Sequence, residues 1–421
     1  MNTAGPTPPP HAAVAAGWSP ALLATAPHRL LFFVGASNVL LAMAWWALWL
    51  LDARWQWHLL PANPLMAGWM HAIVMQYQVL PPFMFGFLLT VFPRWMGVPE
   101  LSRWHYVPVG VGLFGGQLAT VLGMLFGFDA WVQIGLFMTL AGWSYGCVQL
   151  LRALLAERRA RKGPTWHAWS CWSALLLGLV GLCAVVAHLH TQDIRPMMLA
   201  IKLGTFGLLL PVYFTVAHRM FPFFAGNVVK GYSPWRPMWL LAAMWGLSLL
   251  HLLLELAQAH AWLWLADAPL AALSAFVLWR WWPRHAAPGL LWVLFVGFAW
   301  LPVAFGLYAA QSISVAMGDP LTLGRGPAHA LYIGFFGSLL LAMVTRVTQG
   351  HSGQLLTMPN VAWFGFVVLQ LVALLRIAAE VLPDVGAWQA IAALGWLLAF
   401  LPWVVRSLRI YLRPRSDGKP G

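Results

Sequence analysis

Twelve apolar runs, each long enough to cross a lipid bilayer, dominate this sequence of 421 residues. At a rise of about 1.5 Å per residue, a helix of about 20 apolar residues spans the hydrocarbon core. The runs lie at residues 30–51, 66–92, 106–126, 131–155, 168–190, 195–220, 236–258, 262–282, 290–312, 327–347, 360–382 and 387–410. The sequence therefore predicts an all-α, polytopic membrane protein with about twelve transmembrane helices.

The composition also indicates an integral membrane protein. Apolar residues make up 61% of the chain and charged residues 8%, whereas soluble domains carry about 25% charged residues. A formal net charge of +13 would indicate nucleic-acid binding only if the basic residues formed a patch on a soluble surface. Membrane proteins instead gather Lys and Arg in their cytoplasmic loops. We therefore expect membrane lipid, and no nucleic acid, as a partner. The three Cys lack a paired CxxC spacing, so no disulfide framework is predicted.

One membrane domain between two short tails is the predicted organisation. Residues 1–26 are rich in Pro and Ala and lack the pattern of a signal peptide, so we expect a flexible cytoplasmic tail. Residues 27–412 form the twelve-helix domain, and residues 413–421 form a second cytoplasmic tail. No connection between the apolar runs is long enough to fold alone.

The distribution of charge predicts the orientation. Nineteen of the 24 Lys and Arg, including Arg161, Lys162 and Lys419, fall on the side that holds both termini. The opposite side holds most carboxylates, and we expect Asp267 and Asp319 among them. The positive-inside rule therefore predicts that both termini are cytoplasmic.

The tenth run carries polar residues at both ends. His329 lies near its start, Arg346 near its finish and His351 just beyond, while Gly334 and Gly337 would let another helix approach closely. An interfacial histidine and a snorkelling arginine would explain the same residues without a binding site. Both interpretations stay open on this stretch alone.

The second run places different polar groups on one helical stripe. His71, Met75 and Gln78 are spaced i, i+4 and i+7, which aligns an imidazole, a thioether and an amide. Imidazole and thioether suit Cu(I), although a Met at this spacing commonly fills a core. Gln76 and the Pro-Pro pair that follows lie deep in the run, where freed backbone carbonyls require burial in protein. We expect this helix to face the interior.

Charged residues inside the sixth and seventh runs form the third pattern. His251 and Glu255 are spaced i, i+4, and Lys202 lies at similar depth in the neighbouring run. Glu255 is interpreted as the only carboxylate well inside a span, a position that favours a functional role. A Lys202–Glu255 ion pair between helices is one reading. The other is a proton-accepting group that tunes His251 beside a metal.

Three separate regions resemble the signatures of the NnrS family of bacterial membrane proteins. Residues 329–353, reading HALYIGFFGSLLLAMVTRVTQGHSG, resemble one signature, residues 86–97, reading GFLLTVFPRWMG, a second, and the region from Arg219 to Asn227 a third. The resemblance covers most of residues 27–412. Ile73 and Val74 replace the second His and the Glu of an upstream HxHEM motif, and Gln354 replaces a common Arg.

This resemblance implies a protein of the bacterial inner membrane that binds haem b and copper and acts in the response to nitric oxide. Nitric oxide or a related molecule is the implied small ligand. The candidate metal ligands are His71, His329, Met75, His188 and His251. Haem propionates or another anion would bind Arg219, Arg346 and His351, and the metal site would be surrounded by Glu255, Lys202 and Gln78.

Two other classes of protein stay open. A twelve-span secondary transporter would show internal symmetry between its halves, and no repeat is visible in this sequence. A haem-copper reductase usually shows an adjacent pair of histidines. This chain has only His188 and His190, which point about 200° apart on a helix. The redox partner, and whether the protein turns over a substrate, stay undetermined.

Overall fold

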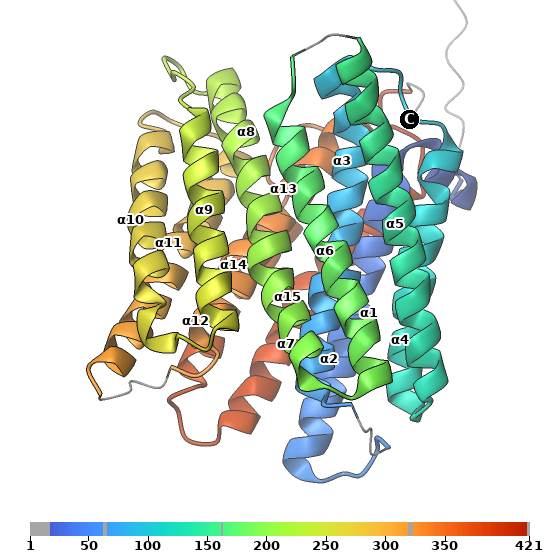
Figure 1. Cartoon of the computed structure of the whole chain (residues 1–421). Helices are drawn as coiled ribbons and strands as arrows, with labels where there is room; N and C mark the ends of the chain where they lie inside the picture. Colours follow the sequence, from blue (N-terminus) through green and yellow to red (C-terminus); the bar gives the residue numbers. More distant parts are fainter. Residues whose placement is uncertain (1–16, 62–64, 161–162, 319–322, 419–421) are drawn as a thin grey trace, which may run out of the picture.

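A computed structural model describes residues 17–61, 65–160, 163–318 and 323–418 of the chain (Figure 1). Arg161, Lys162, Asp319 and Lys419, and the first sixteen residues of the predicted N-terminal tail, lie outside the described residues. The rest of that tail includes a 3₁₀ turn, η1 (Pro20–Thr25). Ser19 N donates a hydrogen bond to Leu412 O at 3.0 Å, so the two ends of the described chain meet at one end of the bundle.

Twelve helices of the described chain are long and apolar enough to cross a membrane, and each overlaps one predicted run, which confirms the all-α class. Nine of the spans are single α-helices, one of them preceded by the turn η3 (Arg103–His105) and one by the turn η5 (His260–Trp262). These helices are α1 (Pro27–Trp55), α4 (Val107–Phe126), α5 (Asp129–Arg159), α6 (Trp166–Thr191), α9 (Met238–Leu256), α10 (Trp264–Trp281), α11 (Gly289–Ala316), α14 (Asn360–Ala378) and α15 (Val385–Tyr411).

Three spans are interrupted by π-helical segments. They are the second, sixth and tenth spans: α2 (Ala67–Val74), η2 (Met75–Val79) and α3 (Pro81–Met96); α7 (Ile194–Leu203), η4 (Gly204–Leu209) and α8 (Leu210–Val228); α12 (Gly326–His329), η6 (Ala330–Gly337) and α13 (Ser338–Ser352). Proline explains part of this pattern. Both α3 and α8 carry proline within their first two residues, and proline has no backbone N–H to donate to the preceding turn. The carbonyl of Gln78, four residues before Pro82, instead accepts a hydrogen bond from Asn38 Nδ2 at 2.8 Å.

The three interrupted spans lie at the centre of the bundle. In their most apolar windows 89, 72 and 78% of the residues are buried, compared with 33–61% in the other nine spans. This burial confirms the expectation that the second span faces the interior. Irregular backbone is tolerated at membrane depth only where protein or water satisfies its polar groups, so the central position of these spans follows from their π-helical segments.

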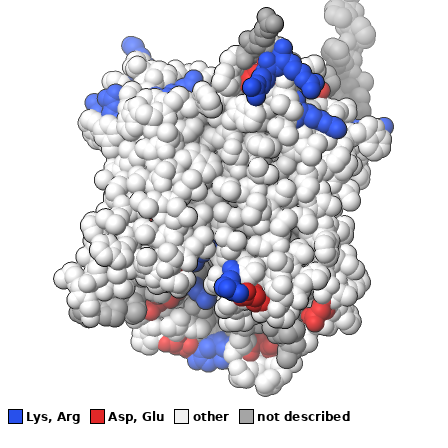
Figure 2. All heavy atoms as spheres, in the orientation of Figure 1, with Lys and Arg blue, Asp and Glu red and all other residues white. Residues whose placement is uncertain are grey.

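The two ends of the bundle differ in charge. Figure 2 shows Lys and Arg gathered at the upper end, an uncharged belt below it, and most Asp and Glu at the lower end. We call the end where the described chain begins and finishes the basic face; it includes Arg158, Arg159, Lys230, Arg284, Arg413 and Arg415. The opposite end is the acidic face, with Asp52, Asp129, Asp193 and Asp384.

The basic face is predicted to be cytoplasmic. In a variant with Cys183 replaced by Ala, cysteines introduced at Lys230 and at Met317 report on opposite faces, since both positions are exposed. A membrane-impermeant maleimide should label Met317→Cys in intact cells and Lys230→Cys only after lysis. The reverse pattern would contradict the predicted orientation.

Candidate functional site

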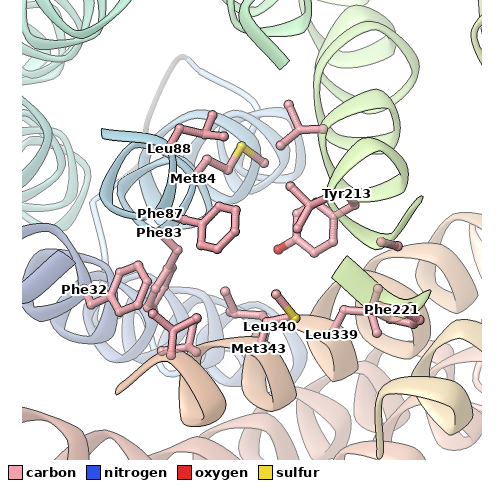
Figure 3. Close-up of a pocket in the computed structure, with 15 residues that line it drawn as sticks. Phe32, Phe83, Met84, Phe87, Leu88, Tyr213, Phe221, Leu339, Leu340 and Met343 are labelled. Carbon is pink, nitrogen blue, oxygen red and sulfur yellow. The ribbon is translucent and has the colours of Figure 1, made fainter. Parts of the chain in front are cut away.

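An apolar cavity of about 70 Å³ lies among α1, α3, α8 and α13, toward the basic face. Figure 3 shows its walls, in which phenylalanine rings alternate with aliphatic side chains and with the thioethers of Met84 and Met343. Among the described residues that line the cavity, Tyr213 alone has an oxygen or nitrogen atom in its side chain. Such a lining favours a small apolar molecule over a polar one.

Arg219 on α8 and Arg346 on α13 lie close to the cavity in the chain. Ala217, two residues before Arg219, and Val347, directly after Arg346, both line it. The Arg219 guanidinium lies 4.2 Å from the ring centroid of Trp95, and that of Arg346 lies 3.9 Å from the ring centroid of Phe224. Neither guanidinium has a carboxylate within ion-pair distance among the described residues. Each is therefore held by an aromatic ring and keeps its N–H donors for an anion.

His351 lies apart from these two arginines. Its ring stacks on His28, with centroids 4.1 Å apart, and its carbonyl accepts a hydrogen bond from Arg415 at 2.9 Å. No contact in the described chain joins His351 to Arg219 or Arg346. The structure thus brings the three predicted anion-binding residues to one face, but not into one cluster.

A second pair of histidines on the basic face was not predicted. His167 on α6 and His218 on α8 are buried, with Nε2 of His167 lying 2.8 Å from Nδ1 of His218. Nε2 of His218 lies 3.1 Å from Pro237 O, just before α9. The two residues are 51 positions apart, so no local spacing could have indicated the pair.

His71 and His329 approach each other near the acidic face. Both rings are partly buried, Arg325 and Arg376 act electrostatically on both, and His71 acts on His329. The same two spans are joined nearby by the hydrogen bond between Gln76 Nε2 and the Tyr332 hydroxyl. The ring of His71 stacks on Trp46, with centroids 4.2 Å apart and an interplanar angle of 12°. The structure therefore brings together the two histidines that the resemblance favours.

The hydrogen bonds of these two rings leave nitrogen atoms free. Nδ1 of His329 lies 2.9 Å from Arg325 O, so it carries the proton and Nε2 keeps its lone pair. His71 has no hydrogen-bond partner among the described residues, and Met75 lies one turn further along its span. No group of three or more His, Cys, Asp or Glu is suitably placed for a metal in the described chain, so any metal here would need other donors as well.

His188 lies on the other side of the second span. It contacts Trp69 edge to face, with centroids 6.0 Å apart, and its Nδ1 lies 2.7 Å from Asp193 O. Asp193 also caps α7, and the guanidinium and backbone N–H of Arg195 hold the pKa of its carboxyl below the usual range. The structure therefore separates His188 from the pair formed by His71 and His329.

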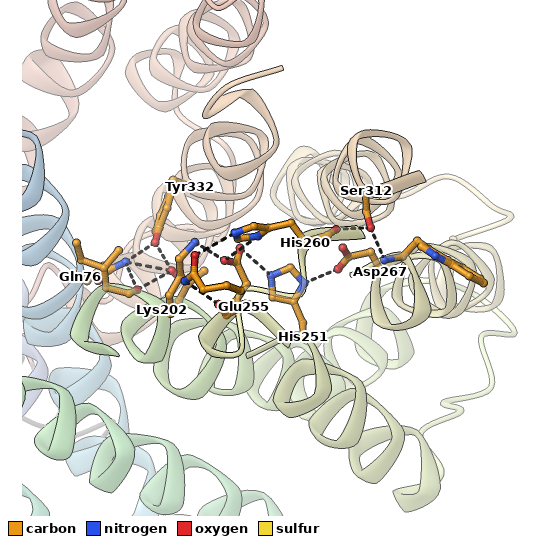
Figure 4. A network of polar contacts seen from close by, with 12 residues as sticks. Gln76, Lys202, His251, Glu255, His260, Asp267, Ser312 and Tyr332 are labelled. Atoms are coloured by element: carbon orange, nitrogen blue, oxygen red, sulfur yellow. Dashed lines mark hydrogen bonds and ion pairs between the residues drawn. The ribbon is translucent and has the colours of Figure 1, made fainter. Parts of the chain in front are cut away.

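Four ionisable side chains form a buried charged cluster near the acidic face (Figure 4). Lys202 Nζ lies 2.8 Å from Glu255 Oε2, so the ion pair between the sixth and seventh spans, one of the two interpretations of these residues, is present. Glu255 Oε1 lies 3.7 Å from His251 Nε2, and His251 Nδ1 lies 2.5 Å from Asp267 Oδ1. Donors and carboxylates alternate along the cluster, which lowers the cost of placing charge in the membrane.

Asp267 corrects the interpretation that Glu255 is the only carboxylate well inside a span. Expected at the outer surface, Asp267 instead lies in α10 and is fully buried against His251. The turn η5 begins this span at the acidic face and carries Asp267 into the bundle. The position of Asp267 five residues inside the run at 262–282 was the available signal.

Each π-helical segment contributes one side chain to a second cluster, which we call the π triad: Gln76 of η2, Thr205 of η4 and Tyr332 of η6. Gln76 Nε2 lies 3.1 Å from Thr205 Oγ1 and also bonds to the Tyr332 hydroxyl. The hydroxyls of Thr205 and Tyr332 bond to each other. Interruptions of this kind are frequent at functional sites, and here three of them meet.

Gln78 lies outside both clusters. Its Nε2 lies 2.9 Å from the hydroxyls of Thr120 and Thr139, on the side of the second span that faces α4 and α5. The segment η2 has a wider turn than an α-helix, so the expected stripe of His71, Met75 and Gln78 does not continue through it. Gln76, two residues earlier, instead points toward the sixth span, where its Nε2 lies 3.1 Å from the carbonyl oxygen of Ile201, the residue before Lys202.

Comparison with protein families connects these features with known proteins. A family model described as NnrS protein matches residues 22–415, nearly the whole chain. A comparison with curated proteins finds no match.

Asp267→Asn should destabilise the protein by about 3 kcal/mol, because it removes the charge that faces a buried imidazole. The measurement is the melting temperature of the detergent-purified protein. Asp129→Asn is the matched control, since Asp129 is exposed at the start of α5. Equal melting temperatures for the two variants would show that the contact between Asp267 and His251 adds little stability.

Proposed function

Because the chain belongs to the NnrS family, we propose that it binds haem and copper in the bacterial inner membrane and acts in the response to nitric oxide. The observation that supports this proposal is that His71 and His329 lie near the acidic face on the second and tenth spans, which the hydrogen bond between Gln76 and Tyr332 joins there. Both histidines also lie in or beside regions that resemble family signatures. The resemblance suggests the identity of the metals, and the position of the two histidines supports their choice as the proposed site.

The donor set at this pair fits iron or copper. A histidine that ligates a metal usually donates its other ring N–H to a carbonyl or carboxylate, as His329 does to Arg325 O. The thioether of Met75 would favour Cu(I). His188 lies across the second span and His251 faces two carboxylates, so the proposal rests on His71, His329 and Met75.

The cavity at the basic face fits nitric oxide better than it fits a haem. Its lining is apolar and aromatic, but a volume of about 70 Å³ holds only a few atoms, so a macrocycle would require these side chains to move apart. Arg219 and Arg346 beside it have the planar donors that bind carboxylates in pairs. They would hold haem propionates or another anion at this end.

Haem iron or copper, when bound, supplies a redox-active centre with a coordination position for a small ligand such as nitric oxide. The protein's residues hold and shield that centre. Trp46 covers one face of the His71 ring, and the carbonyl of Arg325 fixes the orientation and tautomer of His329. Arg376 is paired with Glu380, which offsets one positive charge beside the two imidazoles.

Replacing His71 or His329 by Ala should lower the metal content of the purified protein by more than about tenfold, because each change removes a ligand. Haem is measured by its optical spectrum and copper by elemental analysis. His190→Ala is the control, since that imidazole is exposed at the same face and bonds only within its own helix. Full haem and copper content in both single variants would exclude this pair as the metal site.

Arg346→Lys and Arg219→Lys should weaken haem retention, because lysine keeps the charge but loses the planar pair of donors. The measurement is haem content after washing in detergent at raised ionic strength. Arg284→Lys is the matched control: its guanidinium also lies over an indole ring, that of Trp279, but far from the cavity. Wild-type retention in both variants would mean that these arginines are only positive flanks of their helices.

A further inference from the structure

The buried side of α9 carries four side chains with polar atoms, from the middle of the helix to its end at the acidic face. Trp245, Ser248, His251 and Glu255 follow one another at intervals of three or four residues, which places them on one face of the helix. Ser248, His251 and Glu255 are buried and Trp245 is partly buried. An apolar stripe would be expected on a span whose only role is packing.

We use the word file for the series of polar groups that continues from these side chains through the bundle. It begins at the acidic face. The side chains of Lys202 and His260 are 33 and 50% exposed, and both approach Glu255 Oε2, at 2.8 and 3.9 Å. Glu255 Oε1 is in turn close to His251 Nε2, and His251 Nδ1 contacts the carboxylate of Asp267 (Figure 4). Groups that can reach water are therefore connected through Glu255 to a fully buried imidazole.

Hydroxyl groups follow in the middle of the membrane. Ser248 Oγ donates to Phe206 O at 2.7 Å. One turn nearer the basic face, the hydroxyls of Ser170 and Thr215 lie 2.7 Å apart, and Trp245 Nε1 donates to Ser170 Oγ at 2.7 Å. An indole N–H cannot accept a proton, so Trp245 orients Ser170 and does not itself relay protons.

The pair His167 and His218 completes the file at the basic face. His167 precedes Ser170 by three residues on α6, and His218 follows Thr215 by three residues on α8, so both lie one turn closer to that face. The ring nitrogens are 2.8 Å apart, and His218 Nε2 lies 3.1 Å from Pro237 O, in the connection before α9.

One gap in the file coincides with a small cavity. Successive levels of the file are one helical turn apart, about 5 Å, which is too far for a direct hydrogen bond. Between Ser248 and the level of Trp245 and Pro211 lies a cavity of about 10 Å³, whose lining is apolar apart from Ser248 and Trp245. Its size is at the lower limit for one water molecule, and a water molecule that enters it would bond to the Ser248 hydroxyl.

We propose that this file is a proton path between the two faces of the membrane. Within a level a proton passes along the hydrogen bonds, and between levels a water molecule carries it across one helical turn. One proton leaves at the far face for each that enters, and no other bond changes. Chains of acidic residues and histidines mark proton relays in membranes, and a gap of one water molecule excludes hydrated ions. The path uses none of the proposed metal ligands.

Charged and titratable groups surround both histidine positions on this path. His251 faces Asp267 on α10, Tyr308 on α11 and Glu255 on its own helix, with Lys202 and His260 reached through Glu255. His218 faces His167 on α6, and Arg236 in the preceding connection acts on both rings. Arg219 also acts on His167. All of these groups would influence the rate at which protons pass.

The test is proton flux into liposomes of phosphatidylcholine and phosphatidylglycerol that contain the full-length protein and the pH-sensitive dye pyranine. A potassium gradient with valinomycin drives protons inward. Wild-type protein should raise the flux above that of protein-free liposomes. Ser248→Val, which fills the water-sized cavity and removes a hydroxyl, should lower the protein-dependent flux by about tenfold.

Ser274→Val is the matched control, because Ser274 is a buried serine that bonds only within α10. His251→Gln, compared with His190→Gln, provides a second pair of variants in case Ser248→Val lowers the melting temperature. Flux in wild-type liposomes no greater than in protein-free liposomes would overturn the proposal, as would unchanged flux in His251→Gln. The assay measures no metal, so its outcome is independent of haem or copper binding.

Discussion

A peptide group that loses its helical hydrogen bond inside a membrane needs another partner in the protein, because hydrocarbon offers none. The segments η2, η4 and η6 create such groups near the middle of three spans. Side chains satisfy them: Asn38 Nδ2 bonds to the carbonyl of Gln78, and Gln76 Nε2 and Thr205 Oγ1 both bond to that of Ile201. These bonds can form only where several helices surround the interruption, which fixes the three spans at the centre.

The same central position makes buried charge tolerable. Lys202 belongs to α7, directly before η4, and meets Glu255 on α9 while its side chain still reaches the acidic face. His251 and Asp267 lie deeper and depend on each other, since each would otherwise be a polar group buried without a partner. Tyr308 packs edge to face on His251, with ring centroids 5.3 Å apart. Gln76 of the π triad bonds to the carbonyl of Ile201, the residue before Lys202. The charged cluster and the π triad thus form one polar region.

Hydropathy predicted all twelve spans, because length and apolar composition are sufficient to identify a membrane helix. Equal depth also made an ion pair between Lys202 and Glu255 one of two interpretations, and the structure contains that pair. Contacts that depend on how a helix is rotated about its own axis were harder to predict from the sequence. A regular period of 3.6 residues placed Gln78 on the stripe of His71, whereas η2 changes the register and presents Gln76 instead. Asp267 was misplaced because hydropathy locates the end of a span only to within a few residues.

The order of helices around the bundle, which no sequence pattern specifies, determines which histidines meet. His167 meets His218, His28 meets His351, and His71 approaches His329. Each pair joins spans far apart in the chain. Two of them combine a family signature with a ring nitrogen that has no hydrogen-bond partner among the described residues: Nδ1 of His28 beside His351, and a nitrogen of His71 and of His329. At His329 the carbonyl of Arg325 accepts a hydrogen bond from Nδ1–H, which leaves Nε2 with its lone pair.

The metal-ligand pair and the polar region are physically contiguous. Tyr332 lies three residues after His329, and their rings are 6.4 Å apart, while Gln76 directly follows Met75. A movement of His329 or Met75 would therefore shift members of the π triad, whose hydrogen bonds connect all three central spans. Energetic coupling between sites travels through packed side chains and hydrogen-bond networks of this kind. The interrupted helices thus place the candidate metal ligands and the charged cluster beside the same hydrogen-bonded triad.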